Sequence, residues 1–215
     1  MLATAAPVCR ILVIGCHADD IEIGCGGTLL ALARSNPELE VDWVILSARG
    51  EREAEARASA DAFLGESVVE LRVDVHDFRD GFLPYCGGEV KDVFEELKLR
   101  VDPQVVFTHA GYDFHQDHRF ACELTWNTFR NHLILEYEIP KVDGDLGRPN
   151  VFLPLTAEDV ERKLDLLEQN FRTQSGRHWF DRETFRGLMR LRGMEAVAPD
   201  RFAEAFTARK VSLAA

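Results

Sequence analysis

The sequence has few basic residues for its length. Its 215 residues include 25 lysines and arginines against 37 aspartates and glutamates, which gives a formal net charge of −12. Nucleic acids and anionic membrane surfaces bind basic protein surfaces, so we expect neither as a partner. The sequence also lacks an apolar run of about 20 residues, the length that a transmembrane helix requires, so we expect no membrane span.

Cysteine patterns are missing as well. The five cysteines include no CxxC pair, and their odd number fits no disulfide framework. We therefore expect reduced, mostly buried thiols and no cysteine-based zinc site. The first ten residues, MLATAAPVCR, lack the basic flank and the apolar core of a signal peptide. These absences predict a cytoplasmic protein.

What is present is a regular alternation of strand-like and helix-like segments. With 46% hydrophobic and 29% charged residues, the chain is typical of a folded protein of one domain, residues 1–215. Continuous apolar runs predict buried strands, and amphipathic segments between them predict helices. The strands are expected over 10–16, 40–46, 67–71, 104–108, 133–139, 151–153 and 202–208, and the helices over 27–34, 51–64, 90–100, 120–129, 157–170 and 185–192. This order predicts an α/β fold: a Rossmann-like parallel sheet with helices on both faces and a C-terminal extension.

Three acceptor side chains follow the first expected strand. His17 comes directly after the strand, and Asp19 and Asp20 come next. A glycine-rich segment, 24–27, follows, but it lacks the GxGxxG spacing of a dinucleotide-binding loop. We interpret it as a turn in which the backbone passes close to the site and leads into the helix 27–34.

A second polar cluster follows the fourth expected strand. The loop 109–119 contains three histidines and two aspartates, and His115, Asp117 and His118 lie just before a helix. In a Rossmann-like strand order the first and fourth strands are neighbours, and ligands bind beyond the carboxyl ends of the strands at that point. We therefore expect the two polar clusters to face each other across one crevice.

Two imidazoles and one carboxylate from these clusters form a donor set for a catalytic metal. A catalytic zinc ion takes three protein ligands, usually nitrogen and oxygen donors, and leaves a further position open. His17, Asp20 and His118 supply this set. Zinc would make hydroxide available at neutral pH. Fe²⁺ or another divalent ion is an alternative, because such sites accept several metals.

The remaining polar residues supply catalytic roles. Asp19 adjoins a metal ligand and is the natural general base. A protonated His115 would stabilise the oxyanion that forms when water attacks a carbonyl. Asp117 is placed to hold an imidazole in its charged form or correct tautomer. Taken singly, each residue has an ordinary explanation as a loop residue or a helix cap, but their combination in converging loops favours a metal site.

At these residues the sequence resembles the LmbE-like family, also called the PIG-L or N-acetylglucosaminyl-phosphatidylinositol deacetylase family. Residues 17–20, HADD, with GCGGT at 24–28, are similar to the family motif HPDD…GG, and residues 115–118, HQDH, are similar to its HxDH motif. The resemblance covers the chain to about residue 130. It implies a zinc-dependent enzyme that removes acetyl groups from N-acetylated sugars on a Rossmann-like fold. Ala18 stands where most members have proline, which leaves the substrate open.

The resemblance implies the roles reached above for the two clusters. It makes His17, Asp20 and His118 the zinc ligands. It also makes Asp19 the general base and His115 the residue that stabilises the tetrahedral intermediate.

The resemblance further implies a substrate and two contacts to it. Asp80, in RDG, and Arg52, in GER, are similar to family positions that contact the sugar. We expect hydrolysis of an N-acetyl group from an amino sugar or a sugar-containing precursor such as a sugar nucleotide. The sequence leaves the oligomeric state open between a monomer and a homo-oligomer. Two different functions also fit the sequence: a non-catalytic Rossmann-type module that binds a nucleotide or sugar, and a zinc amidase that acts on a thiol-sugar conjugate.

Overall fold

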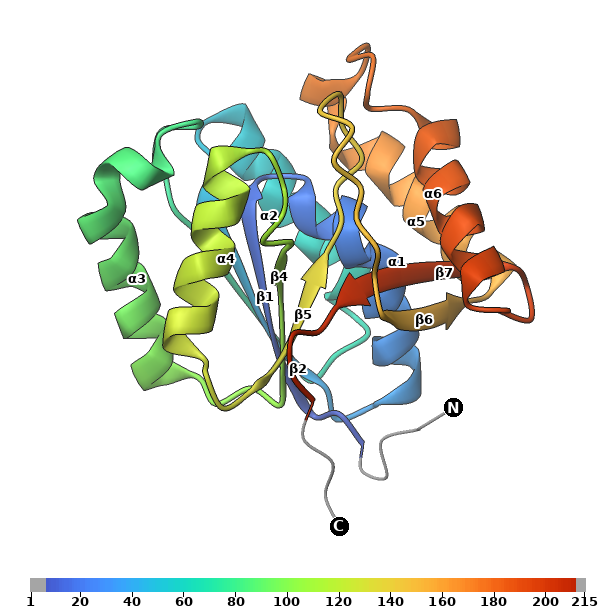
Figure 1. The fold of residues 1–215 in the computed structure, drawn as a ribbon, viewed down its shortest axis with the longest axis horizontal. Helices are drawn as coiled ribbons and strands as arrows, with labels where there is room; N and C mark the ends of the chain where they lie inside the picture. The colour runs from blue at the N-terminus through green and yellow to red at the C-terminus, as the bar shows by residue number, and fades with distance from the viewer. Residues whose placement is uncertain (1–6, 212–215) are drawn as a thin grey trace.

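The computed structural model describes residues 7–211, which form one seven-stranded sheet and the helices around it (Figure 1). The strand order is β3-β2-β1-β4-β5-β7-β6. The strands are β1 (Arg10–His17), β2 (Glu40–Ser47), β3 (Glu70–Val75), β4 (Val105–His109), β5 (Leu133–Tyr137), β6 (Val151–Leu155) and β7 (Phe202–Thr207). The helices are α1 (Asp20–Ser35), α2 (Glu51–Leu64), α3 (Gly87–Arg100), α4 (Gln116–Thr128), α5 (Ala157–Asn170) and α6 (Arg182–Glu195), with 3-10 turns at Leu83–Cys86 and Arg172–Gln174.

The predicted α/β fold is confirmed. Strands β3, β2, β1, β4 and β5 are parallel neighbours, and β7 runs antiparallel between β5 and β6. Strands β1 and β4 are paired, so the loops that follow them leave the same edge of the sheet. Figure 1 shows these loops, and those after β3 and β5, at the upper end of the molecule.

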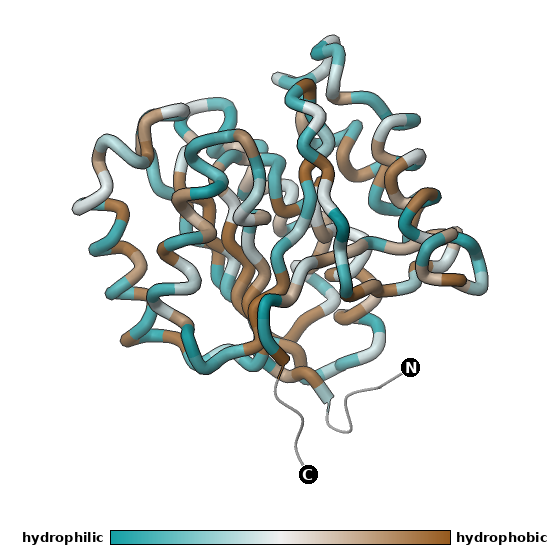
Figure 2. The backbone as a smooth tube through the Cα atoms, in the orientation of Figure 1, coloured by the Kyte–Doolittle hydropathy of each residue, from teal (hydrophilic) through white to brown (hydrophobic). Residues whose placement is uncertain are grey.

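Strands β1, β2 and β4 are almost completely buried, which explains their largely apolar sequences. Along β1, Ile11 and Val13 belong to one core with α1, α2 and α5, whereas Leu12 and Ile14 belong to a second core with α3 and α4. Figure 2 shows the same strands as a hydrophobic band between more polar helices. No helix within residues 7–211 is long and apolar enough to cross a membrane.

The interpretation of residues 24–27 as a turn is wrong. Helix α1 begins at Asp20, and these glycines lie inside it. A Cβ atom on Gly24 would lie 2.2 Å from the ring of Tyr137, and one on Gly26 would lie 2.8 Å from Phe63. The glycines therefore allow α1 to pack closely on β5 and α2, and this tertiary packing outweighs their low helix propensity.

Several boundaries also differ from those expected. The third strand covers 70–75 instead of 67–71, because it pairs in register with β2. Helix α4 begins at Gln116, four residues earlier than expected, because His115 caps its first turn. Asp117 and His118 therefore lie within the helix and not ahead of it.

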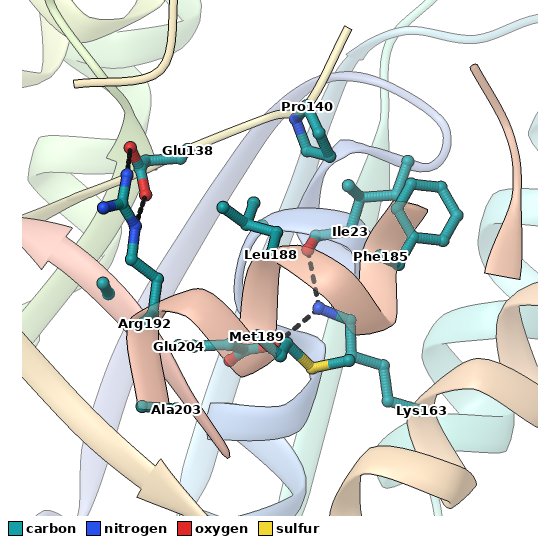
Figure 3. Close-up of a pocket in the computed structure, with 12 residues that line it drawn as sticks. Ile23, Glu138, Pro140, Lys163, Phe185, Leu188, Met189, Arg192, Ala203 and Glu204 are labelled. Carbon is teal, nitrogen blue, oxygen red and sulfur yellow. Dashed lines mark hydrogen bonds and ion pairs between the residues drawn. The ribbon is translucent and has the colours of Figure 1, made fainter. Parts of the chain in front are cut away.

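A buried ion pair joins the C-terminal third to α1. Lys163 of α5 donates to Glu204 of β7 at 2.6 Å and to the carbonyl oxygen of Ile23 at 2.6 Å (Figure 3). The Glu204 carboxylate also accepts the backbone N–H groups of Gly27 and Thr28, at 2.9 and 2.6 Å. These contacts fix α1, the helix that begins with Asp20, against α5 and β7.

Candidate metal and catalytic site

Three candidate ligand atoms form a nearly equilateral triangle beyond the ends of β1 and β4. Nδ1 of His17 lies 3.2 Å from Oδ2 of Asp20 and 3.3 Å from Nε2 of His118, and the latter two atoms are 3.5 Å apart. Zinc bonds of about 2.0–2.1 Å in tetrahedral geometry place ligand atoms about 3.3 Å apart. The spacing of these donors therefore fits a divalent metal ion with one further position open.

The three residues reach this point from separate elements. His17 ends β1, Asp20 opens α1, and His118 lies in the first turn of α4. Because β1 and β4 are adjacent, the sheet brings the two sequence clusters together as the topology predicts.

The charges of the triangle favour a bound cation. Burial alone would raise the pKa of Asp20, but the neighbouring His118, His109 and His17 hold it well below its usual range. Burial alone would lower the pKa of His118, but Asp20 and Asp113 raise it. The carboxylates around the triangle therefore favour positive charge at His118, and a bound metal ion would take the place of its proton.

Asp113 orients His118, a role that the sequence interpretation did not give it. Its Oδ2 lies 2.9 Å from Nδ1 of His118, and its Oδ1 accepts the N–H of His115 at 2.7 Å. The ammonium group of Lys141 lies 3.0 Å from the same Oδ1. A carboxylate on Nδ1 keeps the proton there and leaves Nε2 free for a metal. The sequence signal for this role was an acidic residue in a loop that also contains three histidines.

Asp117, which was expected to orient an imidazole, mainly binds a loop. Its carboxylate accepts the N–H groups of Gly81 and Leu83, at 2.7 and 3.1 Å. Its Oδ2 also lies 3.6 Å from Nε2 of His17. Asp80, expected to contact substrate, places Oδ1 3.0 Å from that same nitrogen while its side chain stays 75% exposed.

Asp19 is buried with one oxygen unused. Its Oδ1 accepts a hydrogen bond from Nη2 of Arg52 at 2.7 Å, whereas Oδ2 has no hydrogen-bond partner within residues 7–211. Burial raises the pKa of Asp19, although Arg52 opposes the shift. A buried carboxylate with a free oxygen and a raised pKa is suited to accept a proton. Arg52, which the sequence predicts to bind substrate, contacts the candidate base in the structure.

His115 lies beside the two histidines of the triangle. It caps α4, where its Nδ1 accepts the N–H of Asp117 at 3.3 Å. Its ring centroid is 4.5 Å from that of His118 and 5.0 Å from that of His17. Burial and these two imidazoles lower the pKa of His115. A neutral ring that accepts at Nδ1 carries its proton on Nε2, so it can donate from that atom.

His109 is a further member of the cluster without an assigned role. It stacks on His118 with ring centroids 3.8 Å apart, and its Nε2 lies 3.2 Å from Oδ2 of Asp20. Burial, together with the charge on His118, lowers its pKa to about 4, so it is neutral near pH 7.

Four other sets of candidate ligand atoms lie within 4.8 Å of one another: His17/His115/His118, Cys16/Asp20/His109, His109/Asp113/His118 and His17/Asp80/Asp117.

Comparison with known proteins identifies one family. The sequence profile of the PIG-L family, described as GlcNAc-PI de-N-acetylase, matches residues 12–129. This range contains both polar clusters and every candidate site residue named above except Lys141. No curated protein matches the chain.

Solved structures with the same fold include more than one activity. The N,N′-diacetylchitobiose deacetylase from Pyrococcus horikoshii has a TM-score of 0.72 and 21% identity, over 94% of this chain and 84% of that one. The 4-carboxy-2-hydroxymuconate hydratase from Pseudomonas putida KT2440 has a TM-score of 0.76 and 17% identity, over 96% and 98%. The zinc-inhibited form of a teicoplanin deacetylase has a TM-score of 0.62 and 16% identity, over 94% and 100%. At these identities the likeness shows the fold alone.

Proposed function

Because the chain belongs to the GlcNAc-PI de-N-acetylase (PIG-L) family, we propose that it is a metal-dependent hydrolase that removes the acetyl group from an N-acetylated amino sugar. The observation that carries this proposal is the triangle formed by His17, Asp20 and His118, with edges of 3.2, 3.3 and 3.5 Å. The deacetylases among its structural neighbours support the same reaction class.

Three residues of this chain would bind the metal, and a fourth would orient one of these ligands. His17 would bind through Nδ1, Asp20 through Oδ2 and His118 through Nε2, with Asp113 fixing the tautomer of His118. When bound, zinc or a related divalent ion supplies a Lewis acid and lowers the pKa of water to about 7. The zinc-inhibited form of one neighbour is consistent with metal binding in this fold.

Asp19 would move the protons of the reaction. Its free Oδ2 accepts a proton from the attacking water, while Arg52 holds Oδ1 in place. The C–N bond of the acetamide then breaks, and the same carboxylic acid returns the proton to the leaving nitrogen. The products are acetic acid and the free amine, which near pH 7 are present as acetate and ammonium, so atoms and charge balance.

His115 would stabilise the developing oxyanion. Its Nδ1 is occupied by the N–H of Asp117, so Nε2–H is the donor available to a carbonyl oxygen. The neutral ring that its environment favours is sufficient for this role, in place of the protonated ring that the sequence interpretation assumed. Asp80, exposed beside His17, would contact the sugar.

The hydratase with this fold defines the main competing activity. Fold alone does not fix chemistry, and adding water to a double bond also needs a base and an electrophile. The family profile favours deacetylation. Two more functions compete with it: a zinc amidase that releases a larger acid, and a non-catalytic binding module.

An acetate-release assay tests the proposal directly. The metal-loaded protein is incubated with N-acetylglucosamine, its glycosides and N-acetylated sugar nucleotides, and acetate and free amine are measured with and without a chelator. We expect equimolar acetate and amine, abolished by the chelator and restored by zinc. Absence of acetate from every substrate by a folded, metal-loaded protein would reject deacetylation, and release of a larger acid would favour the amidase.

A further inference from the structure

The exposed aromatic side chains of the described residues lie at one end of the sheet. Of the phenylalanines, tyrosines and tryptophans, all of which lie within 7–211, only Phe82, Tyr85 and Phe114 are exposed, at 39%, 76% and 66%. Phe82 and Tyr85 lie in the segment after β3, and Phe114 lies in the loop after β4. Both segments are at the end of the sheet that carries the candidate site (Figure 1).

The segment after β3 contacts the start of α4, and the loop that carries Phe114 leads directly into this helix. Gly81, next to Phe82, donates its N–H to Asp117 at 2.7 Å and accepts a hydrogen bond from the Gln116 side chain. Phe114 lies between Asp113 and His115, both of which belong to the site. The exposed rings are therefore carried by the same short segments that build the site.

Phe82 and Tyr85 form one surface patch with Arg79. Their ring centroids are 5.7 Å apart, and the Arg79 guanidinium lies 3.5 Å from the centroid of Phe82. The backbone N–H of Phe114 donates to Asp145 at 2.6 Å, and this contact brings in a loop that carries the exposed Leu146.

Solvent reaches the candidate site beside this patch. Asp80 contacts Nε2 of His17, yet its side chain is 75% exposed, and Phe82 lies two residues further along the chain. An acetyl group must reach the buried ligand atoms, so the remainder of a substrate extends outward on the exposed side. Exposed apolar groups at such a mouth indicate a binding surface.

We propose that Phe82, Tyr85 and Phe114 bind an apolar aglycone, so that the enzyme prefers amino sugars that carry an aryl or alkyl group over those with a small polar one. This inference rests on the proposed function and names a substrate class for the same site. Aromatic rings gain free energy when an apolar partner covers them. A benzyl group that covers one exposed ring is expected to improve kcat/KM about tenfold, which corresponds to about 1.4 kcal/mol.

The test compares two substrates that differ only in the aglycone. The zinc-loaded protein is assayed with methyl and with benzyl N-acetyl-β-D-glucosaminide. We expect kcat/KM about tenfold higher for the benzyl compound. Phe82→Ala and Phe114→Ala should each lower the ratio of the benzyl to the methyl kcat/KM about three- to fivefold. Leu99→Ala, which removes an 87% exposed side chain from α3, is the matched control and should leave this ratio unchanged.

Equal rates for the two substrates in the parent, or equal losses on both in the variants, would overturn the inference while leaving deacetylation intact. N,N′-diacetylchitobiose places a polar ring at the same position, and a gain as large as that of benzyl would reject the apolar class. If no glucosaminide is hydrolysed, calorimetric binding to Asp19→Asn decides separately: tighter binding of the benzyl compound than of the methyl one supports the surface, and equal binding rejects it.

Discussion

The substitution Asp113→Asn tests how the candidate metal site is oriented. Asp113 accepts the Nδ1 proton of His118 at 2.9 Å and the backbone N–H of His115 at 2.7 Å. Asparagine keeps the shape of the side chain but removes the charge. Its amide group can also face His118 with a donor, which favours the tautomer with the proton on Nε2, the atom that would bind the metal.

The expected loss of metal affinity follows from the role of a carboxylate that orients a histidine ligand. Removing a partner that orients a metal-binding histidine typically weakens the metal about 10- to 100-fold, or about 1.4–2.7 kcal/mol. Zinc affinity is measured by competition with a chromophoric chelator at pH 7.5, and circular dichroism checks that the variant is folded. Activity is not needed for this measurement.

The control is Asp145, the second carboxylate that contacts Lys141. Lys141 contacts both Asp113 and Asp145, but Asp145 does not touch His118. Asp145→Asn should therefore change zinc affinity by less than about threefold, well below the effect expected for the orienting carboxylate. The reasoning fails if Asp113→Asn binds zinc as tightly as the parent, or if Asp145→Asn weakens it equally.

Three further predictions concern the base, the packing of α1 and the start of α5. Asp19→Asn should retain zinc and lower kcat by about 10²–10⁴-fold in the acetate assay; full activity would remove Asp19 as the base. Gly24→Ala should lower the free energy of unfolding by about 1–3 kcal/mol in urea, because its Cβ would lie 2.2 Å from the ring of Tyr137, and an unchanged midpoint would contradict this packing. Burial would raise the pKa of Asp159, but Arg34 and the cap of α5 hold it below its usual range. Its contribution to the free energy of unfolding is therefore present above about pH 4 and is lost as the pH falls through the lower folded-state pKa. Asp159→Asn should therefore cost about 1 kcal/mol at pH 7 and progressively less below pH 4; a cost independent of pH would contradict the ionised cap.

The arrangement of the sheet could be predicted because it depends on local patterns. The first and fourth strands are apolar runs, and their alternation with helices predicts the parallel part of the sheet, in which a Rossmann-like order makes β1 and β4 neighbours. The approach of His17 to His118 follows from that topology and needs no side-chain detail.

The errors arose where distant contacts decide the local structure. Residues 24–27 have a turn-like composition, and only the ring of Tyr137, far along the chain, shows why glycine is needed within a helix. Asp113 and Asp117 are equivalent in sequence, as two acids in one histidine-rich loop. Their different partners, His118 for one and the backbone of Gly81 for the other, depend on how the loop after β3 folds back.

The central claim is that one divalent metal ion is held by His17, Asp20 and His118. Its most direct test is the zinc content of the purified protein after zinc loading and exhaustive dialysis, measured by elemental analysis for the parent and for His118→Ala. The account predicts one equivalent per chain in the parent and less than about a tenth in the variant, with both proteins folded. A folded His118→Ala that keeps a full equivalent would contradict it.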